Sequence, residues 1–230
     1  MSMALILAIE TTTRLCSVAL GRDGLVLTQR EVESERHAHA EKVNVFVAQV
    51  MEEAGLKLAE IDAVAVGIGP GSYTGSRIGL SAAKGLCYAL DKPIIGVNTL
   101  TTLVEAARAA HRNTALRQWP MIDARRMEVF TQEHNADGVA AGEVHPQVLD
   151  EEWAQAVGNC LVFGDGADKA TELWKSTPHI VRVPGIQAHA RAMFAHAERR
   201  LRDGMVDDLA YLVPLYGKEA NVTQPKKRSA

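Results

Sequence analysis

The stretch GPGSYTGSRIG, residues 69–79, places four glycines and a proline between an apolar segment and a long helical pattern. Residues 61–68 before it predict a short buried strand, and Ser72 or Thr74 can cap a helix that continues to about Leu90. Free backbone N–H groups converge where a glycine turn meets a helix N-terminus, so phosphate binding is one interpretation. The other is a plain tight turn, because the glycines match neither the Walker A loop nor the dinucleotide-binding pattern.

Small residues recur every four positions along this helix, at Gly75, Gly79 and Ala83, and predict one smooth face. Such a face allows another helix to approach closely while the apolar residues around it become buried. Those apolar residues are Ile78, Ala82, Leu86 and Leu90. The face either packs inside the domain or forms a docking surface for another subunit.

The composition is that of an ordinary soluble globular protein. The chain has 230 residues, of which 47% are hydrophobic, and a formal net charge of −3. It can bury a full core in one large or two small domains. The net charge would not attract nucleic acid, so RNA binding by this chain alone requires a local basic patch. The densest basic run is Lys226-Lys227-Arg228, which is either a solvated end or a phosphate contact within a complex.

Cysteine usage and apolar patterning bear on the compartment. Cys16, Cys87 and Cys160 are odd in number, widely spaced and flanked by apolar residues, which predicts reduced, buried thiols. The N-terminus lacks a secretory pattern, and no segment reaches the roughly 18 apolar residues that span a bilayer. We expect a cytoplasmic protein with no membrane contact.

The predicted elements follow the same order in both halves of the chain, namely three strands, a helix, a strand, a helix, a strand and a helix. The first half places them at residues 4–9, 16–20, 25–32, 38–54, 61–68, 72–90 and 93–97, with a last helix begun by Thr99 or Thr101. The second half places them at residues 120–123, 127–134, 139–145, from about 150, 160–163, 167–174, 179–183 and 187–202.

This repeated order is typical of the ribonuclease H-like fold in the actin, Hsp70 and sugar kinase superfamily (ASKHA). The fold class is therefore α/β, with two tandem ribonuclease H-like domains that face each other across a cleft. We place the first domain at residues 1–108 and a second, smaller one at residues 109–203. A C-terminal segment, residues 204–230, is expected to pack back on the first domain.

In that superfamily the turn after the first strand holds nucleotide phosphates. Here the turn reads Glu10-Thr11-Thr12-Thr13-Arg14, whose hydroxyls can donate to an anion and whose carboxylate can orient a hydrated metal ion. Threonine is also simply a good strand and turn residue. A second glycine turn, at residues 164–169, is interpreted as a plain connection.

The sequence shows no motif for metal or hydrolase chemistry. His37 and His39 stand two residues apart, whereas a chelating pair on a helix requires positions i and i+4. The sequence has no H-E-x-x-H motif, and no Ser, His and acid arrangement stands out from the background. We therefore expect no metal site and no hydrolase chemistry in this chain.

Four segments together resemble the TsaB (YeaZ) family. They are IETTT (9–13) with CSVAL (16–20), RHAHAE (36–41), GPGSYTGSRIG (69–79) and DARRMEV (123–129). The resemblance implies a role in forming threonylcarbamoyladenosine next to the anticodon of tRNAs that read codons beginning with A. It implies a subunit that supports catalysis without performing it.

The resemblance also implies partners. The chain would pair with and activate the homologous transferase TsaD, joined by the ATPase TsaE, and would form a homodimer when alone. ATP or ADP and a metal ion would belong to the partners or to the shared interface, and tRNA would bind to the complex. His37 is followed four residues on by Glu41, so the metal-binding histidine pair of TsaD is missing here. Glu10 stands where family members usually carry Asp, which argues further against nucleotide binding by this chain alone.

The docking helices implied by the resemblance are residues 38–54 and 72–90, which would form a bundle with the matching pair of TsaD. The expected interface residues are Gly71, Ser72, Tyr73, Thr74, Gly75, Arg77, Ile78, Gly79, Ala82, Ala83, Leu86, Val43, Phe46, Val47 and Val50. A vestigial or interface nucleotide site would involve Glu10, Thr11, Thr12, Thr13, Gly69 and Gly71.

Two other functions stay open at this point. One is an ATP-dependent kinase or ATPase of the same fold, with phosphates held by Thr11 to Thr13 and by the loop at Gly69 to Gly71. The other is a tRNA-binding module in its own right, against which the acidic balance argues.

Overall fold

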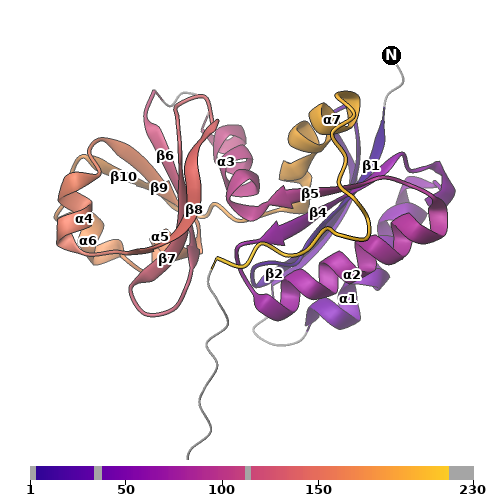
Figure 1. Cartoon of the computed structure of the whole chain (residues 1–230), viewed down its shortest axis with the longest axis horizontal. Helices are drawn as coiled ribbons and strands as arrows, with labels where there is room; N and C mark the ends of the chain where they lie inside the picture. Colours follow the sequence, from indigo (N-terminus) through magenta and orange to yellow (C-terminus); the bar gives the residue numbers. More distant parts are fainter. Residues whose placement is uncertain (1–3, 34–37, 112–114, 218–230) are drawn as a thin grey trace, which may run out of the picture.

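The computed structural model describes residues 4–33, 38–111 and 115–217 and contains two five-stranded mixed sheets (Figure 1). The first sheet has the strand order β3-β2-β1-β4-β5, and the second has the corresponding order β8-β7-β6-β9-β10. In each sheet the first strand pairs antiparallel with the second and parallel with the fourth. The element order predicted for the two halves is therefore present in both sheets.

The first sheet consists of β1 (Leu5–Glu10), β2 (Leu15–Arg22), β3 (Leu25–Glu33), β4 (Ala63–Gly69) and β5 (Ile94–Asn98). The second consists of β6 (Arg117–Asp123), β7 (Glu128–His134), β8 (Ala140–Val148), β9 (Cys160–Phe163) and β10 (Ile180–Val183). The helices are α1 (Ala38–Ala54), α2 (Tyr73–Leu90), α3 (Thr99–Ala110), α4 (Glu151–Ala156), α5 (Asp165–Asp168), α6 (Thr171–Lys175) and α7 (Phe194–Arg202), with 3₁₀ turns η1 (Leu58–Glu60) and η2 (Ala190–Met193).

Every residue of β1 is buried because helices cover both faces of the first sheet. On one face, α1 and α2 contribute Val50 and Leu80 to the cluster that contains Leu7. On the other face, η2 and α7 contribute Met193 and Phe194 to a second cluster. Figure 1 shows α1 and α2 on one side of the sheet and α7 on the other. The carboxyl end of β1 is thus fixed from both sides.

Helix α3 joins the two sheets. Its buried residues Leu100 and Leu103 belong to one apolar cluster with Ile122 of β6 and Phe163 of β9. Figure 1 shows α3 between the two sheets. The space between the halves is therefore largely filled by side chains.

The helix predicted at residues 167–174 is wrong as one element, because the chain forms two short helices, α5 and α6. They are separated at Ala170, whose backbone leaves the helical region (φ −99°, ψ 25°). The Trp174 indole N–H donates to the Ala167 carbonyl oxygen at 2.8 Å. The indole thereby takes up a carbonyl that a continuous helix would use, which stabilises the break.

The helix predicted at residues 187–202 begins later than expected and lies elsewhere. Residues 190–193 form η2, and α7 follows from Phe194. The sequence pattern places this segment in the second domain, residues 109–203, but it packs on the first sheet. The reason is steric, since Gly21 of β2 has no Cβ and leaves room for the Phe194 ring. The chain reaches this face through Ile186 and Ala188, which are buried between the halves.

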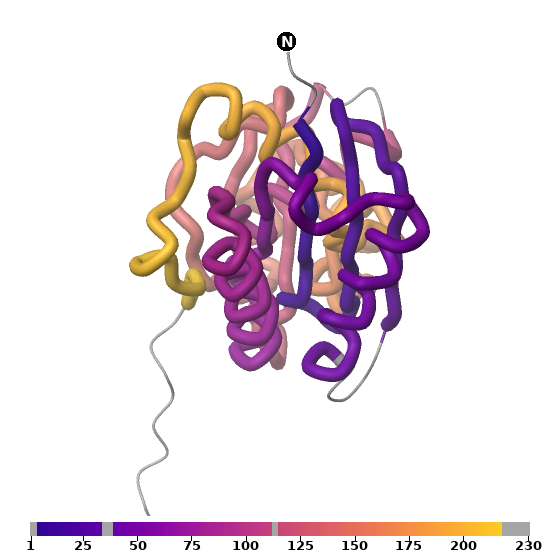
Figure 2. Tube along the Cα trace, turned by 90° about the vertical axis from the view of Figure 1, so that its right-hand side faces the viewer, coloured from indigo at the N-terminus to yellow at the C-terminus, as the bar shows by residue number. Residues whose placement is uncertain are grey.

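Residues 205–217, here called the C-terminal strap, run back across the first half. Asp207 forms a bridge with Ile94 of β5, and the Leu215 backbone N–H donates to the Ile68 carbonyl at 2.7 Å. Leu209 and Leu212 pack against the core cluster that contains α1 and α2. Figure 2 shows this segment passing alongside α2. The strap is therefore part of the surface that α2 presents.

Some sequence predictions fall on residues that the structure does not describe. They include His37 and the basic run Lys226-Lys227-Arg228. Among the helices of the described ranges, none is long and apolar enough to cross a membrane.

Candidate functional site

In the threonine turn after β1, Thr11 and Thr12 are buried and Thr13 is half-buried, and all three hydroxyl groups form hydrogen bonds within the chain. The Thr11 hydroxyl donates to the Gly75 carbonyl oxygen at 2.8 Å, and the Thr12 and Thr99 hydroxyls lie 2.8 Å apart in a hydrogen bond. The Thr13 hydroxyl accepts from the Leu15 backbone N–H at 3.2 Å. A phosphate could take the proton that Thr11 donates only by breaking this contact, whereas the Thr13 hydroxyl, which only accepts here, keeps its own proton.

The glycine loop lies directly on this turn. The Ser72 backbone N–H donates to the Thr12 carbonyl oxygen at 2.6 Å. A Cβ at Gly71 would overlap that same oxygen, and a Cβ at Gly75 would overlap the Thr11 carbonyl oxygen. These two glycines are thus required by the close approach of two backbone segments. The backbone of this loop therefore occupies the space directly beside the turn.

Glu10 ends β1 as a fully buried carboxyl group. Its Oε1 accepts from the Thr12 backbone N–H at 2.7 Å, while Oε2 has no hydrogen-bond partner among the described residues. Burial raises the pKa of Glu10 to about 7, and the hydrogen bonds with Thr12 oppose this rise. The carboxylate faces Gly67 of β4, where any Cβ would overlap it. Within the described part of the chain, no three His, Cys, Asp or Glu residues form a group that could hold a metal ion.

The space between the two halves is small beside the threonine turn. A cavity of about 50 Å³ lies there, and it is lined by Thr13, Arg14, Leu15, Glu33, Leu103, Ile122, Asp165, Ile186, Gln187 and Ala188. Pockets that bind drug-sized ligands usually measure about 300–1,000 Å³. A nucleotide does not fit this cavity in the conformation described here.

The small-residue face of α2 is internal, so its expected role as an exposed docking face was wrong. Gly75, Gly79 and Ala83 are buried within the chain. A Cβ at Gly79 would overlap the Thr11 hydroxyl oxygen. The stripe of small residues fits the threonine turn and β1 rather than another subunit.

Part of the expected α1 surface is internal too. Val43, Phe46, Val47 and Val50 are all buried in the core of the first half, so they pack within this chain, and their contact with a partner stays a prediction. Their spacing follows the face that α1 turns toward the sheet. Of these four, Val43 also lies at the floor of a surface groove.

That groove runs between α1 and α2. Its volume is about 590 Å³, and its lining residues are Ala40, Val43, Asn44, Tyr73, Thr74, Arg77, Ile78, Ser81 and Ala82. Six of these were predicted as interface residues from the sequence. Ser72 lies next to the groove and caps α2 by accepting from the Gly75 backbone N–H at 3.1 Å. Gly71 and Leu86 are half-buried outside the lining set.

One wall of the groove ends in an arginine packed against two tyrosines. The Arg77 guanidinium carbon lies 3.9 Å from the centre of the Tyr73 ring, and Arg77 Nε donates to the Tyr216 hydroxyl at 2.8 Å. The centroids of the two rings lie 5.2 Å apart. Tyr216 belongs to the C-terminal strap, so the groove and the strap form one continuous surface.

All four tyrosines of the chain lie on α2 and the strap. Tyr73, Tyr88, Tyr211 and Tyr216 are 52%, 84%, 82% and 45% exposed. Exposed tyrosine and arginine side chains are typical of protein interfaces. The sequence pattern alone does not predict a role for the strap tyrosines. The signal that could have indicated them is the apolar and aromatic run YLVPLY at residues 211–216, which fits no helix or strand period.

The remaining candidates are structural. The second glycine turn positions Asp165, whose Oδ1 accepts a hydrogen bond from the Asp123 backbone N–H at 2.9 Å. The three cysteines are free and buried, and burial raises the pKa of each thiol to about 11. Such thiols are poor nucleophiles at neutral pH.

Known proteins resemble this chain in both sequence and fold. Residues 31–162 match the family model described as TsaD, tRNA N6-adenosine threonylcarbamoyltransferase. The chain is 36% identical over 184 residues to the tRNA threonylcarbamoyladenosine biosynthesis protein TsaB of Escherichia coli, covering 77% of this chain and 78% of that protein.

Solved structures resemble this chain as well. A protein from Pseudomonas aeruginosa, described as uncharacterized with similarity to peptidase YEAZ, superposes with a TM-score of 0.78 at 27% identity. The match covers 94% of this chain and all of that one. An inorganic polyphosphate/ATP-glucomannokinase from Arthrobacter matches at a TM-score of 0.50 and 14% identity over 86% of this chain and 99% of that one, which supports the actin-like α/β fold alone. The sequence match over most of both chains and the shared structure together show that this chain belongs to the TsaB (YeaZ) family.

Proposed function

We propose that this chain is the non-catalytic subunit that supports threonylcarbamoyladenosine formation in tRNA by pairing with the TsaD transferase. The observation that carries the proposal is the contrast between two surfaces of α2. Its N-terminus fills the threonine turn, where related folds hold phosphate, while its outer face lines an open groove of about 590 Å³. The groove offers a place for a protein partner, whereas the cavity of about 50 Å³ beside the threonine turn is too small for a nucleotide in this conformation, which supports the proposal.

The similarity to TsaD supports a docking mode. The matching part, residues 31–162, contains both α1 and α2. A partner with the same helix pair can place it against this one around an approximate twofold axis. A second copy of this chain offers the same helices, so a homodimer is the expected state when TsaD is missing. TsaE would join the pair, and ATP or ADP and any metal ion would be held by the partners or at the shared interface.

The groove has the chemistry of a protein interface. Its floor is apolar at Val43, Ile78 and Ala82, and its edge carries Tyr73 and Arg77. Aromatic and arginine side chains around an apolar centre are typical of the residues that dominate binding energy. We place the protein in the cytoplasm, where tRNA is modified and where its three thiols stay reduced.

The test is a pairing experiment with a matched control. Ala82→Glu places a charge on the groove, and Ala195→Glu places the same charge on an exposed position of α7, on the opposite face of the sheet. Complex mass with TsaD is measured for both variants, with the fold checked by circular dichroism. We expect Ala82→Glu to weaken pairing at least 100-fold and Ala195→Glu to pair normally. Normal pairing by a folded Ala82→Glu variant would contradict the docking mode.

A further inference from the structure

The turn between β6 and β7 holds two consecutive arginines in a backbone conformation that arginine rarely adopts. Arg125 and Arg126 have φ values of 73° and 51°, both in the left-handed region. Residues 124–127 connect the two strands, and Asn and Gly adopt a positive φ far more easily than arginine does. A hairpin chosen for stability alone would not carry arginine at both positions.

The turn is held firmly by its neighbours. The Arg125 backbone N–H donates to Asp123 Oδ1 at 2.8 Å, and the Glu128 backbone N–H donates to the Arg125 carbonyl at 3.2 Å. Lys169 bonds to both Asp123 Oδ1 and the Glu128 carbonyl oxygen. The backbone of the turn therefore has a defined shape on the second sheet.

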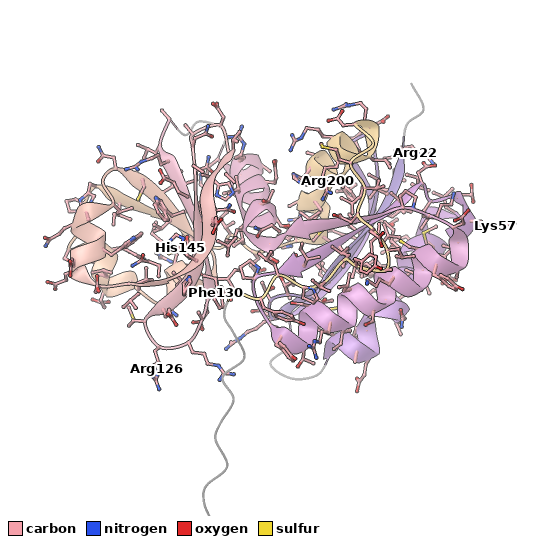
Figure 3. All side chains as sticks on the ribbon, viewed as in Figure 1. Arg22, Lys57, Arg126, Phe130, His145 and Arg200 are labelled. Atoms are coloured by element: carbon pink, nitrogen blue, oxygen red, sulfur yellow. The ribbon has the colours of Figure 1, made fainter. Side chains whose placement is uncertain are left out.

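The two guanidinium groups are exposed and unengaged within the described ranges, in which neither Arg125 nor Arg126 has a hydrogen bond or an ion pair from its side chain. The carboxylates of Asp123 and Asp168 nearby are already paired, with Lys169 and Arg182 respectively. Figure 3 shows Arg126 at the outer edge of the second half, pointing away from the sheet.

We infer that Arg125 and Arg126 contact the phosphodiester backbone of tRNA bound to the complex. Guanidinium groups bind phosphate through paired, charge-assisted hydrogen bonds. The chain has a net charge of −3, so its RNA contact requires a local group of free cations, and these arginines form one. The inference rests on the proposed function, because the RNA is the substrate of the pair with TsaD.

The test measures tRNA affinity of the assembled pair as a function of salt, by fluorescence anisotropy. The variant is Arg125→Gly/Arg126→Gly, which removes both charges and suits the left-handed backbone. Its matched control is Arg199→Ala/Arg202→Ala, which removes two exposed charges from α7. We expect the turn variant to bind tRNA about tenfold more weakly at low salt and to reduce the salt slope by about 1–2, because each lost phosphate contact removes close to one unit. We expect the control to bind like the wild type.

Each other outcome has a distinct meaning. Wild-type affinity and slope for the turn variant would overturn the inference, as would an equal loss in the α7 control. Loss of TsaD pairing by the turn variant, with tRNA affinity of the remaining complex unchanged, would overturn it too and make the turn a protein contact instead. If the wild-type chain and TsaD do not pair at all, the proposed function fails. The same salt titration on this chain alone then decides the role of the turn.

Discussion

The turns after the first strands of the two sheets occupy the same place in the same strand order, yet they differ in exposure. In the first half, Thr11 and Thr12 are buried under the start of α2. In the second half, Arg125 and Arg126 are exposed. The helix that follows the fourth strand meets the two turns differently, because the start of α2 bonds to Thr11 and Thr12, whereas α5 bonds to the end of β6 at Asp123 and, among the described residues, forms no hydrogen bond with Arg125 or Arg126. One topology can therefore fill a loop in one half and present it to solvent in the other.

The largest effect is expected where α2 meets the buried turn. Gly79→Leu would drive a side chain into the Thr11 hydroxyl, and we expect a loss of about 3 kcal/mol or more in the free energy of unfolding. Urea titration followed by circular dichroism measures it. Gly85→Ala on the same helix meets no atom within 4 Å and should gain up to about 1 kcal/mol. A stable Gly79→Leu variant that fails to pair with TsaD would restore the small-residue face as a docking surface.

Glu10 makes the buried turn sensitive to pH. Its pKa is about 7 in the folded chain, raised from the ordinary glutamate value of 4.5, so the folded state binds more protons than the unfolded state between these values. Each unit of pKa shift corresponds to about 1.4 kcal/mol. The free energy of unfolding should therefore fall by about 3 kcal/mol as the pH rises from about 4.5 to 7 and then stay constant. Glu10→Gln removes this charge and should be markedly more stable than the wild type at pH 8 and similar to it at pH 5.

The comparison is urea unfolding of both proteins at the two pH values. An equal stability difference at pH 5 and pH 8 would show that the carboxyl group stays ionised in the folded chain and that the turn has access to water.

A smaller effect is expected at the bond that ties the buried turn to α3. Thr12→Val leaves the Thr99 hydroxyl buried without its partner and should reduce the free energy of unfolding by about 1–2 kcal/mol. The double variant Thr12→Val/Thr99→Val should be less destabilised than the sum of the single variants. Chemical denaturation of all four proteins gives the coupling. Strict additivity would mean that the two hydroxyls do not share a hydrogen bond.

The smallest effect is expected at the exposed turn and has the opposite sign. Arg126→Gly relieves a positive φ, and we expect a gain of about 0.5–1 kcal/mol in stability. Ala124→Gly, in the same turn but without a positive φ, should lose a little stability instead. Thermal unfolding of the two variants compares them. A loss of stability in Arg126→Gly would show that the arginine supports the fold of the turn.

The sequence predicted much of this fold from local patterns. Helix α1 begins at Ala38 and ends at Ala54, as its 3.6-residue period and the following Gly55 predict. Strand β9 spans Cys160–Phe163, as predicted from its apolar run. The prediction that the order of elements repeats along the chain is also confirmed. Each of these depends on residues that are close together in the chain.

The features that the sequence did not predict depend on contacts between residues far apart in the chain. The small-residue stripe of α2 indicates that something approaches closely, but the stripe alone does not distinguish a partner helix from Thr11, which lies 64 residues before Gly75. The strap shows no helical or strand periodicity in its sequence. Its position is set by the bridge between Asp207 and Ile94 and by the hydrogen bond from Arg77 to Tyr216. The position of α7 likewise depends on the absence of a side chain at Gly21.

The most direct test of the central claim is to assay the purified chain for ATP hydrolysis and tRNA threonylcarbamoylation, alone and with TsaD and TsaE. We expect no turnover of ATP and no modified tRNA by this chain alone, and modification that depends on its presence when the partners are supplied. ATP hydrolysis by this chain alone, lost in a Thr12→Val variant that still folds, would contradict it and make the threonine turn an active site.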